Sequence, residues 1–324
     1  MKAVLCKAYG LPEDLVIEEV ESPRAGRGQV VVKVKACGVS FPDTLIIQGK
    51  YQFKPPMPFS PGGELAGIVQ EVGPGVEGIK AGDHVIAFTG WGGYAQEVVT
   101  EASRIIPMPG NMDFATAAIF IMTYGTSHYA LKDRAHLKAD ETLLVLGAAG
   151  GVGLAAVELG KVMGARVIAA ASSDEKLSVC KRYGADEVIN YTTEDLKDRI
   201  KELTGGDGVD VIYDPVGGKY AEPALRGMAW EGRYLVVGFA DGEIPRIPLN
   251  LTLLKGCSIV GVFWGSFMRK EPGTAFKNQA HLMAWLTGGK LKPLISAVYP
   301  LAQAPRALND LIERKAKGKV VLSI

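Results

Sequence analysis

Residues 146–153, Leu-Gly-Ala-Ala-Gly-Gly-Val-Gly, have the composition and spacing of a loop that holds a pyrophosphate. The loop follows the apolar run 142–146 and precedes an apolar pattern with helical spacing. Gly147 permits a tight turn, Gly150 lets the backbone approach the anion, and Gly153 lets the helix pack closely on the strand. The helix dipole favours the anion, and the first helical N–H groups face it. The residues expected to present those groups are Gly151 and Val152.

The end of the next strand indicates which dinucleotide binds. NAD enzymes place Asp or Glu there to hydrogen-bond the ribose hydroxyls, whereas residues 169–173 read Ala-Ala-Ala-Ser-Ser. Ser173 can donate to a 2′-phosphate, and Lys176 can pair with its charge. Asp174 and Glu175 fall in the first turn of the following helix, where acids commonly cap. NADPH is therefore the predicted cofactor.

Two kinds of pattern divide the chain. From about residue 120, strands buried on both faces alternate with helices, which predicts right-handed βαβ units and a doubly wound parallel sheet. Before that point, short strands such as 29–36 are separated by Gly and Pro, which predicts a compact antiparallel β domain. We expect the α/β class with domain bounds 1–121, 122–290 and 291–324, the last returning to the first domain. Elements expected late in the chain are a helix at 220–229, strands at 233–238 and 258–263, and a helix at 281–286.

Composition and charge are those of an ordinary globular enzyme. Hydrophobic residues make up 48% of the 324, and 36 basic against 35 acidic residues give a net charge of +1, so we expect no nucleic-acid or membrane partner. No apolar run reaches the roughly 18 residues of a membrane span, and no secretory signal begins the sequence. The four cysteines are scattered, which favours reduced thiols and a cytoplasmic location. They are Cys6, Cys37, Cys180 and Cys257.

Seven motifs along the chain resemble the medium-chain dehydrogenase/reductase superfamily, and specifically its zinc-independent quinone oxidoreductase branch. The resemblance covers essentially the whole chain. It implies a GroES-like catalytic domain and a Rossmann domain, with the active site in the cleft between them. The motifs lie at 36–43, 61–64, 80–85, 148–153, 188–191, 214–217 and 318–322.

Two departures from the superfamily pattern concern zinc. Zinc-dependent alcohol dehydrogenases have a ligand cysteine where this chain has Ser40 and a ligand histidine where it has Gly63. A catalytic zinc needs three protein ligands, so the resemblance implies catalysis without metal. Cys37 is adjacent to the ligand position, and we interpret it as a buried thiol.

The resemblance also implies the residues of the site. It places Ser40 near the nicotinamide, Thr126 beside the carboxamide and Tyr191 near the 2′-phosphate. Strand ends and the terminal motif supply further expected cofactor contacts, although the lysine among them could also be solvated. These contacts are Gly238, Phe239, Phe263, Trp264 and Lys319.

Reducing a quinone or an enone builds negative charge on an oxygen, which a hydrogen-bond donor stabilises. The resemblance implies Tyr51 as donor and proton source, with Ser40 as the second catalytic candidate; Tyr51 could instead only line the cleft. The quinone enzymes often have a further tyrosine where this chain has Leu45. We therefore expect an NADPH-dependent enzyme that passes hydride to a quinone or similar activated double bond.

Two other functions remain open at this point. An enoyl-CoA or enoyl-thioester reductase would need a basic track for its acyl carrier, and a catalytically idle NADPH-binding sensor or structural protein would need none. The apolar strand 257–264 suggests a sheet edge that pairs in a homodimer. The basic residues that could form the track are Arg226, Arg233, Arg246, Arg269 and Lys270.

Overall fold

The computed structural model describes residues 1–110 and 112–324. The chain forms two compact units. Unit 1 comprises residues 1–122 and 293–324, and unit 2 comprises residues 123–292. Among the described residues, no helix combines the length and the apolar character that a membrane crossing requires.

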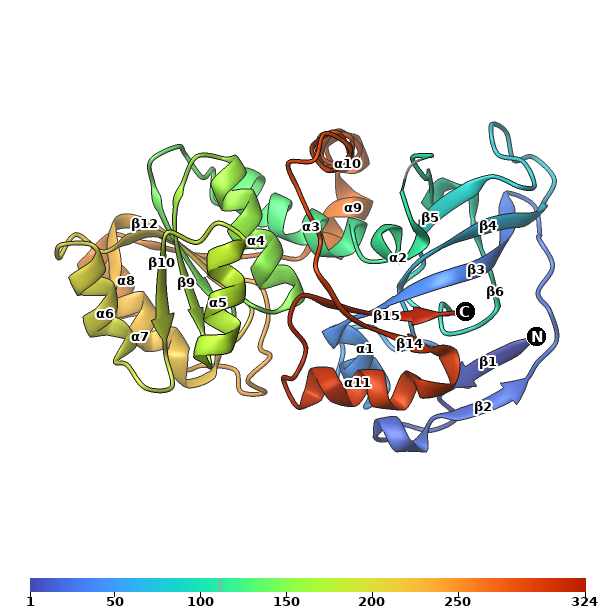
Figure 1. Ribbon diagram of the computed structural model, residues 1–324, viewed down its shortest axis with the longest axis horizontal. Helices are drawn as coiled ribbons and strands as arrows, with labels where there is room; N and C mark the ends of the chain where they lie inside the picture. Colours follow the sequence, from blue (N-terminus) through green and yellow to red (C-terminus); the bar gives the residue numbers. More distant parts are fainter. Residues whose placement is uncertain (111) are drawn as a thin grey trace. The chain divides into compact units, whose positions relative to one another are not determined.

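Unit 1 is built on a seven-stranded sheet with the order β14-β15-β3-β4-β5-β7, to which β6 is added by pairing with β3. A two-stranded ribbon, β1 (Lys2–Leu5) with β2 (Val16–Glu19), accompanies it. The sheet strands are β3 (Gln29–Val39), β4 (Glu64–Val72), β5 (His84–Phe88), β6 (Glu97–Glu101), β7 (Ile105–Pro107), β14 (Ile295–Pro300) and β15 (Lys319–Ser323). Its helices are α1 (Phe41–Ile46), α2 (Phe114–Ala117) and α11 (Ala304–Ile312). Figure 1 shows α11, in red, beside α1, in blue, although the two lie far apart in the sequence.

The alternation of Val with Lys that predicted a half-buried strand corresponds to β3. Its valines are buried and Lys33 is exposed, but the strand continues past Ala36 to Val39 with both faces buried. Gly38 is needed there because a Cβ would lie 2.4 Å from the Ala118 carbonyl oxygen. The terminal strand β15 pairs antiparallel with this part of β3, and Val320 lies opposite Val39. The pairing brings the end of the chain to the start of α1.

Unit 2 contains a six-stranded parallel sheet with the order β10-β9-β8-β11-β12-β13. This is the 3-2-1-4-5-6 order of a doubly wound dinucleotide-binding sheet, so the predicted fold class is confirmed. Figure 1 shows α4 and α5 beside β9 and β10. The strands are β8 (Thr142–Leu146), β9 (Arg166–Ala171), β10 (Glu187–Asn190), β11 (Val209–Asp214), β12 (Met228–Val236) and β13 (Ser258–Gly261). The helices are α3 (Ile121–His128), α4 (Gly151–Val162), α5 (Asp174–Arg182), α6 (Leu196–Leu203), α7 (Ala221–Arg226), α8 (Asn250–Lys255), α9 (Trp264–Lys270) and α10 (Pro272–Thr287).

The four elements expected late in the chain have other bounds in the structure. The strand expected at 233–238 is β12, which runs from Met228 to Val236. The helix expected at 220–229 ends at Arg226, because Gly227 terminates it and Met228 already pairs with Val209 of β11. The sixth strand ends at Gly261, and Phe263 stands before α9. The helix expected at 281–286 is only the later part of α10.

Candidate functional site

The predicted pyrophosphate loop connects β8 to α4 in unit 2. Gly147 has a φ of 57°, a conformation that favours glycine, and its carbonyl oxygen accepts from the Gly150 N–H at 3.0 Å. Gly150 is the N-cap of α4. A Cβ on Gly153 would lie 2.3 Å from the Gly147 carbonyl oxygen, so only glycine fits. The twelve-residue helix α4 therefore begins at the loop with Gly151 and Val152 at its amino end, an arrangement that suits a pyrophosphate.

The residues predicted to select the cofactor lie where β9 ends. Ser173 is the N-cap of α5, and its Oγ accepts from the Lys176 N–H at 3.4 Å. The Lys176 Nζ donates to the Ser172 Oγ at 3.1 Å, so the ammonium lies at the strand end. The Tyr191 N–H donates to the Ala171 carbonyl oxygen at 3.2 Å. The structure thus brings Ser173 and Lys176, at the start of α5, and Tyr191, which follows β10, to one edge of the sheet, although they come from two segments.

The other predicted cofactor contacts of unit 2 differ in exposure. Phe263 exposes 49% of its surface, whereas Trp264 exposes 5%. Trp264 packs over α3, where a Cβ on Gly125 would lie 2.9 Å from the indole ring. Half-buried Thr126 follows on the same helix. Trp264 therefore has a place in the core of unit 2, and its contact with a cofactor stays a prediction.

Gly238 and Phe239 follow the carboxyl end of β12. The Gly238 N–H donates to the Asp214 carbonyl oxygen at 3.3 Å, which ties this turn to the end of β11. The Asp214 carboxylate accepts from the Val216 N–H at 2.7 Å and from the Tyr234 hydroxyl. These bonds fix the turn after β11, whose Val216 side chain lies against Gly147. Sequence reasoning assigned no role to Asp214.

Unit 1 contains a buried cation at the start of α1. The Lys319 side chain, from the first residue of β15, is only 7% exposed, and its Nζ donates to the Ser40 Oγ at 2.6 Å. The alternative that the Lys319 side chain is merely exposed to solvent is therefore wrong. Because Ser40 accepts from the ammonium, the serine keeps its own hydroxyl proton for donation to another group.

Two buried carboxyl groups lie close to this ammonium. The Asp43 carboxyl group accepts from the Ser40 N–H at 2.8 Å, from the Gly62 N–H at 3.2 Å and from the Tyr94 hydroxyl at 3.2 Å. Glu64 accepts from the Met122 N–H at 2.8 Å through Oε1, and its buried Oε2 has no hydrogen-bond partner among the residues that the structure describes.

Burial controls the protonation of this cluster. Burial raises the pKa of Asp43 to about 6 and that of Glu64 to about 7, and the Lys319 ammonium opposes both shifts. Burial also lowers the pKa of Lys319, while the two acids act to raise it. Because acids and ammonium stabilise one another's charged forms, removing either charge would leave its partner uncompensated.

Tyr51 lies in the turn after α1 and is half-buried. Its ring meets Phe53 edge-on at 5.1 Å, and it packs against the core of unit 1. Burial raises the pKa of Tyr51, and the Asp43 carboxylate adds to the shift. The phenol therefore stays protonated at neutral pH and can act as a hydrogen-bond donor.

Of the five basic residues proposed for an acyl-carrier track, Arg226, Arg233 and Arg246 pair with acids or lie among them. Arg233 pairs with Glu141 at 2.6 Å and is only partly exposed, and Arg226 pairs with Glu222 at 2.6 Å. Arg226 lines a surface hollow together with the other residues of mixed charge there: Asp195, Lys197, Lys219, Glu222, Glu243 and Arg246. Arg226, Arg233 and Arg246 therefore do not form the continuous basic track that the enoyl-thioester alternative requires.

Comparison with known proteins places the chain in a family. A family model described as alcohol dehydrogenase GroES-like domain matches residues 26–110, and one described as zinc-binding dehydrogenase matches residues 151–280. The chain is 41% identical to quinone oxidoreductase-like protein 2 homolog of Nematostella vectensis, over 99% of this chain and 88% of that protein. It is 36% identical to the quinone oxidoreductase of Rattus norvegicus, over 99% of this chain and 97% of that protein. The chain belongs to the quinone oxidoreductase family.

Two solved structures match the chain over its full length. The quinone oxidoreductase of Escherichia coli, solved in complex with NADPH, has a TM-score of 0.93 at 31% identity, and 100% of each chain is covered. A probable oxidoreductase from Mycobacterium abscessus has a TM-score of 0.90 at 42% identity, with 100% of this chain and 99% of that chain covered. The medium-chain dehydrogenase/reductase assignment from sequence motifs is confirmed.

Both positions that carry zinc ligands in the alcohol dehydrogenases have other surroundings in this quinone oxidoreductase family member. Ser40 binds the Lys319 ammonium. A Cβ on Gly63 would lie 3.0 Å from the Gly90 carbonyl oxygen, which leaves little room for a histidine. No three His, Cys, Asp or Glu side chains within residues 1–110 and 112–324 are arranged to hold a metal ion. Catalysis without zinc stays a prediction.

Proposed function

We propose that this protein is an NADPH-dependent oxidoreductase that transfers hydride to a quinone or a similarly activated double bond without a metal. The observation that carries the proposal is the full-length likeness to a quinone oxidoreductase solved with NADPH. The loop at Gly147 and Gly153, which only glycine fits, supports it from within the chain. Ser173 and Lys176, which lie where β9 ends, support a cofactor that carries a 2′-phosphate.

The proposed chemistry assigns a task to each group of residues. When bound, the nicotinamide supplies a hydride, which is two electrons and one proton, and the acceptor becomes an anion until it takes a second proton. The α4 amino end would hold the pyrophosphate, and Thr126 and Phe239 would contact the nicotinamide end of the cofactor. Tyr51 donates the second proton to the acceptor oxygen, and Ser40 stabilises the developing anion by donating its hydroxyl proton in a hydrogen bond.

Lys319 supports this chemistry through Ser40. Its Nζ occupies one lone pair of the Ser40 Oγ, so the serine hydroxyl proton must point elsewhere. The ammonium also brings a positive charge to a position adjacent to a developing oxyanion. In a metal enzyme a bound cation would polarise that oxygen, and we assign this electrostatic task to the buried lysine.

Metal-stripped protein tests the proposed function. After dialysis against a chelator, with bound metal quantified by elemental analysis, we expect oxidation of NADPH by 9,10-phenanthrenequinone at the rate of the untreated protein. An unchanged rate is expected because a protein cation, Lys319, supplies the charge near Ser40. Activity that disappears with the metal and returns on addition of zinc would refute the metal-free part of the proposal. Absence of NADPH oxidation in both samples would refute the activity itself.

We also propose that the protein forms a homodimer through the edge strand of unit 2. β13 is the last strand of its sheet, and Ile259 on it is 41% exposed. Large apolar side chains are exposed nearby in sequence, and pairing two copies would cover them and the open edge. They are Leu249, Leu253 and Leu254.

Light scattering after size-exclusion chromatography measures the oligomeric state. We expect twice the 34.5 kDa of one chain and a shift toward monomer in Ile259→Lys, since the substitution would bury an unpaired charge in the interface. Lys255→Ala, at the end of α8, removes a lysine near the same surface and serves as the control. A wild-type protein that elutes only as monomer at micromolar concentration would contradict the dimer.

The location in the cell is a proposal as well. All four cysteines are free and buried, as is typical of thiols in a reducing compartment, and we therefore propose a cytoplasmic location.

A further inference from the structure

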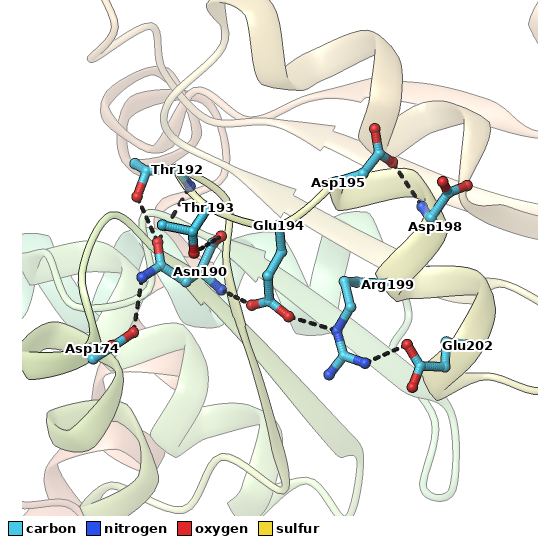
Figure 2. A network of polar contacts seen from close by, with 9 residues as sticks. All are labelled: Asp174, Asn190, Thr192, Thr193, Glu194, Asp195, Asp198, Arg199 and Glu202. Carbon is cyan, nitrogen blue, oxygen red and sulfur yellow. Dashed lines mark hydrogen bonds and ion pairs between the residues drawn. The ribbon is translucent and has the colours of Figure 1, made fainter.

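Asn190, the last residue of β10, is the centre of a polar network at the edge where β9 and β10 end (Figure 2). The side chain is 8% exposed. Its Nδ2 donates to the Asp174 Oδ1 at 2.8 Å, and its Oδ1 accepts from the Thr192 N–H at 3.2 Å and the Thr192 hydroxyl at 2.7 Å. The buried Asn190 amide thus links two exposed residues, Asp174 and Thr192, that follow the ends of β9 and β10.

The network continues through the backbone of Asn190 into α6. The Asn190 N–H donates to the Glu194 Oε2 at 2.7 Å, and Glu194 forms an ion pair with Arg199 at 2.7 Å. Arg199 in turn pairs with Glu202, as Figure 2 shows. The segment 190–194 is thereby fixed at both ends, and Tyr191, one of the predicted 2′-phosphate contacts, lies within it.

The contact with Asp174 has a consequence for the cofactor. Asp174 is the first residue of α5, and Ser173 and Lys176 lie beside it in the sequence. A carboxylate at this strand end repels a 2′-phosphate, whereas it would accept from the hydroxyls of an unphosphorylated ribose. The Asn190 amide binds this carboxylate, and the Lys176 ammonium donates to the Ser172 hydroxyl.

We propose that Asn190 is a positioning residue for cofactor selection, because its amide holds the Asp174 carboxylate away from the 2′-phosphate site and orders the Tyr191 segment. This inference rests on the proposed function, in which NADPH binds at the end of β9. Asn190 itself acts through Asp174 and Tyr191 and needs no contact with the cofactor. Its effect is therefore specific for the nucleotide that carries the 2′-phosphate.

Dissociation constants for NADPH and NADH, measured by calorimetry on the full chain, test the proposal. In Asn190→Ala we expect NADPH binding to weaken about tenfold, because a released carboxylate then repels the phosphate, while NADH binding changes less than about twofold. Adding Asp174→Ala to that variant removes the carboxylate, so NADPH affinity should return to within about threefold of wild type. Thr193→Ala is the matched control, since Thr193 is exposed in the same segment and contributes only a 3.4 Å contact to the Asn190 carbonyl oxygen.

The outcomes distinguish the role of Asn190 from the proposed function on which it rests. Equal weakening of NADPH and NADH in Asn190→Ala, or a double variant that remains as weak as the single one, would overturn the role of Asn190 and leave the proposed function intact. Wild-type protein that binds NADH as tightly as NADPH would overturn both, because there would then be no preference to position. Circular dichroism of each variant establishes that it is folded before its affinities are compared.

Discussion

Lys319→Met is expected to lower the free energy of unfolding by about 3 to 5 kcal/mol at pH 8, the usual cost of removing one partner from a buried ion cluster. Methionine matches the length of the lysine side chain but carries no charge. The Asp43 and Glu64 carboxyl groups then lose the ammonium that opposes the burial-induced rise of their pKa values. Ser40 also loses its 2.6 Å hydrogen-bond donor.

The destabilisation should depend on pH in a defined direction. Asp43 and Glu64 have pKa values of about 6 and about 7 in the folded protein, above the usual range, so the folded state binds their protons more tightly than the unfolded state. Their contribution favours folding at low pH and is lost as the pH rises through these values. Without Lys319 both pKa values rise further. The deficit of Lys319→Met should therefore be small at pH 5 and markedly larger at pH 8.

Denaturant unfolding followed by circular dichroism measures this deficit. Lys315→Met is the control, because Lys315 is exposed on the same terminal segment and pairs with the exposed Glu313. We expect its unfolding transition to coincide with that of wild type at both pH values. A deficit of equal size at pH 5 and pH 8, or none at either, would mean that the Lys319 charge does not compensate the buried acids.

The dinucleotide loop could be predicted from sequence because its determinants are local. Gly147, Gly150 and Gly153 lie within one strand-turn-helix unit, where Gly147 has a positive φ and Gly153 approaches the Gly147 carbonyl oxygen closely. The α/β class follows from the same kind of local pattern, the alternation of buried strands with helices. The predicted end of α7 was wrong because its determinant is not local. The pairing of Met228 with Val209 of β11 starts a strand where the helical spacing of the sequence continues.

The buried cluster of unit 1 could not be predicted in this way. Lys319 and Ser40 are 279 residues apart, and only the pairing of β15 with β3 brings them together. Lysine side chains are mostly exposed in proteins, so the residue type alone predicted that Lys319 is exposed to solvent. Asp43 and Glu64 lie in motifs that resemble the family, and this resemblance was the only signal that could have indicated them. Asn190 lies in the motif at 188–191, but the motif gave it no role, because that role depends on its contact with the Asp174 carboxylate.

Quinones are expected to be far better acceptors than crotonyl-CoA, by about 100-fold in kcat/KM. An enoyl reductase uses the remote anionic carrier to position the double bond, and a basic track would supply that binding energy. Arg233 is held by Glu141, Arg226 is held by Glu222, and acids balance the charges of the hollow that Arg226 lines. A compact quinone needs no such track, since its oxygens are activated directly by the donors proposed at Tyr51 and Ser40.

The most direct test of the central claim is the rate of NADPH oxidation by the purified protein with 1,4-benzoquinone, 9,10-phenanthrenequinone and crotonyl-CoA compared at equal enzyme concentration. Tyr51→Phe, which removes only the hydroxyl, is measured beside wild type to separate a proton donor from an aromatic wall. We predict rapid turnover of the quinones, little turnover of the thioester and a slower quinone rate in Tyr51→Phe. Preferential turnover of crotonyl-CoA would make the protein an enoyl reductase, and tight NADPH binding without oxidation by any of the three would make it a binding protein; either result contradicts the proposed function.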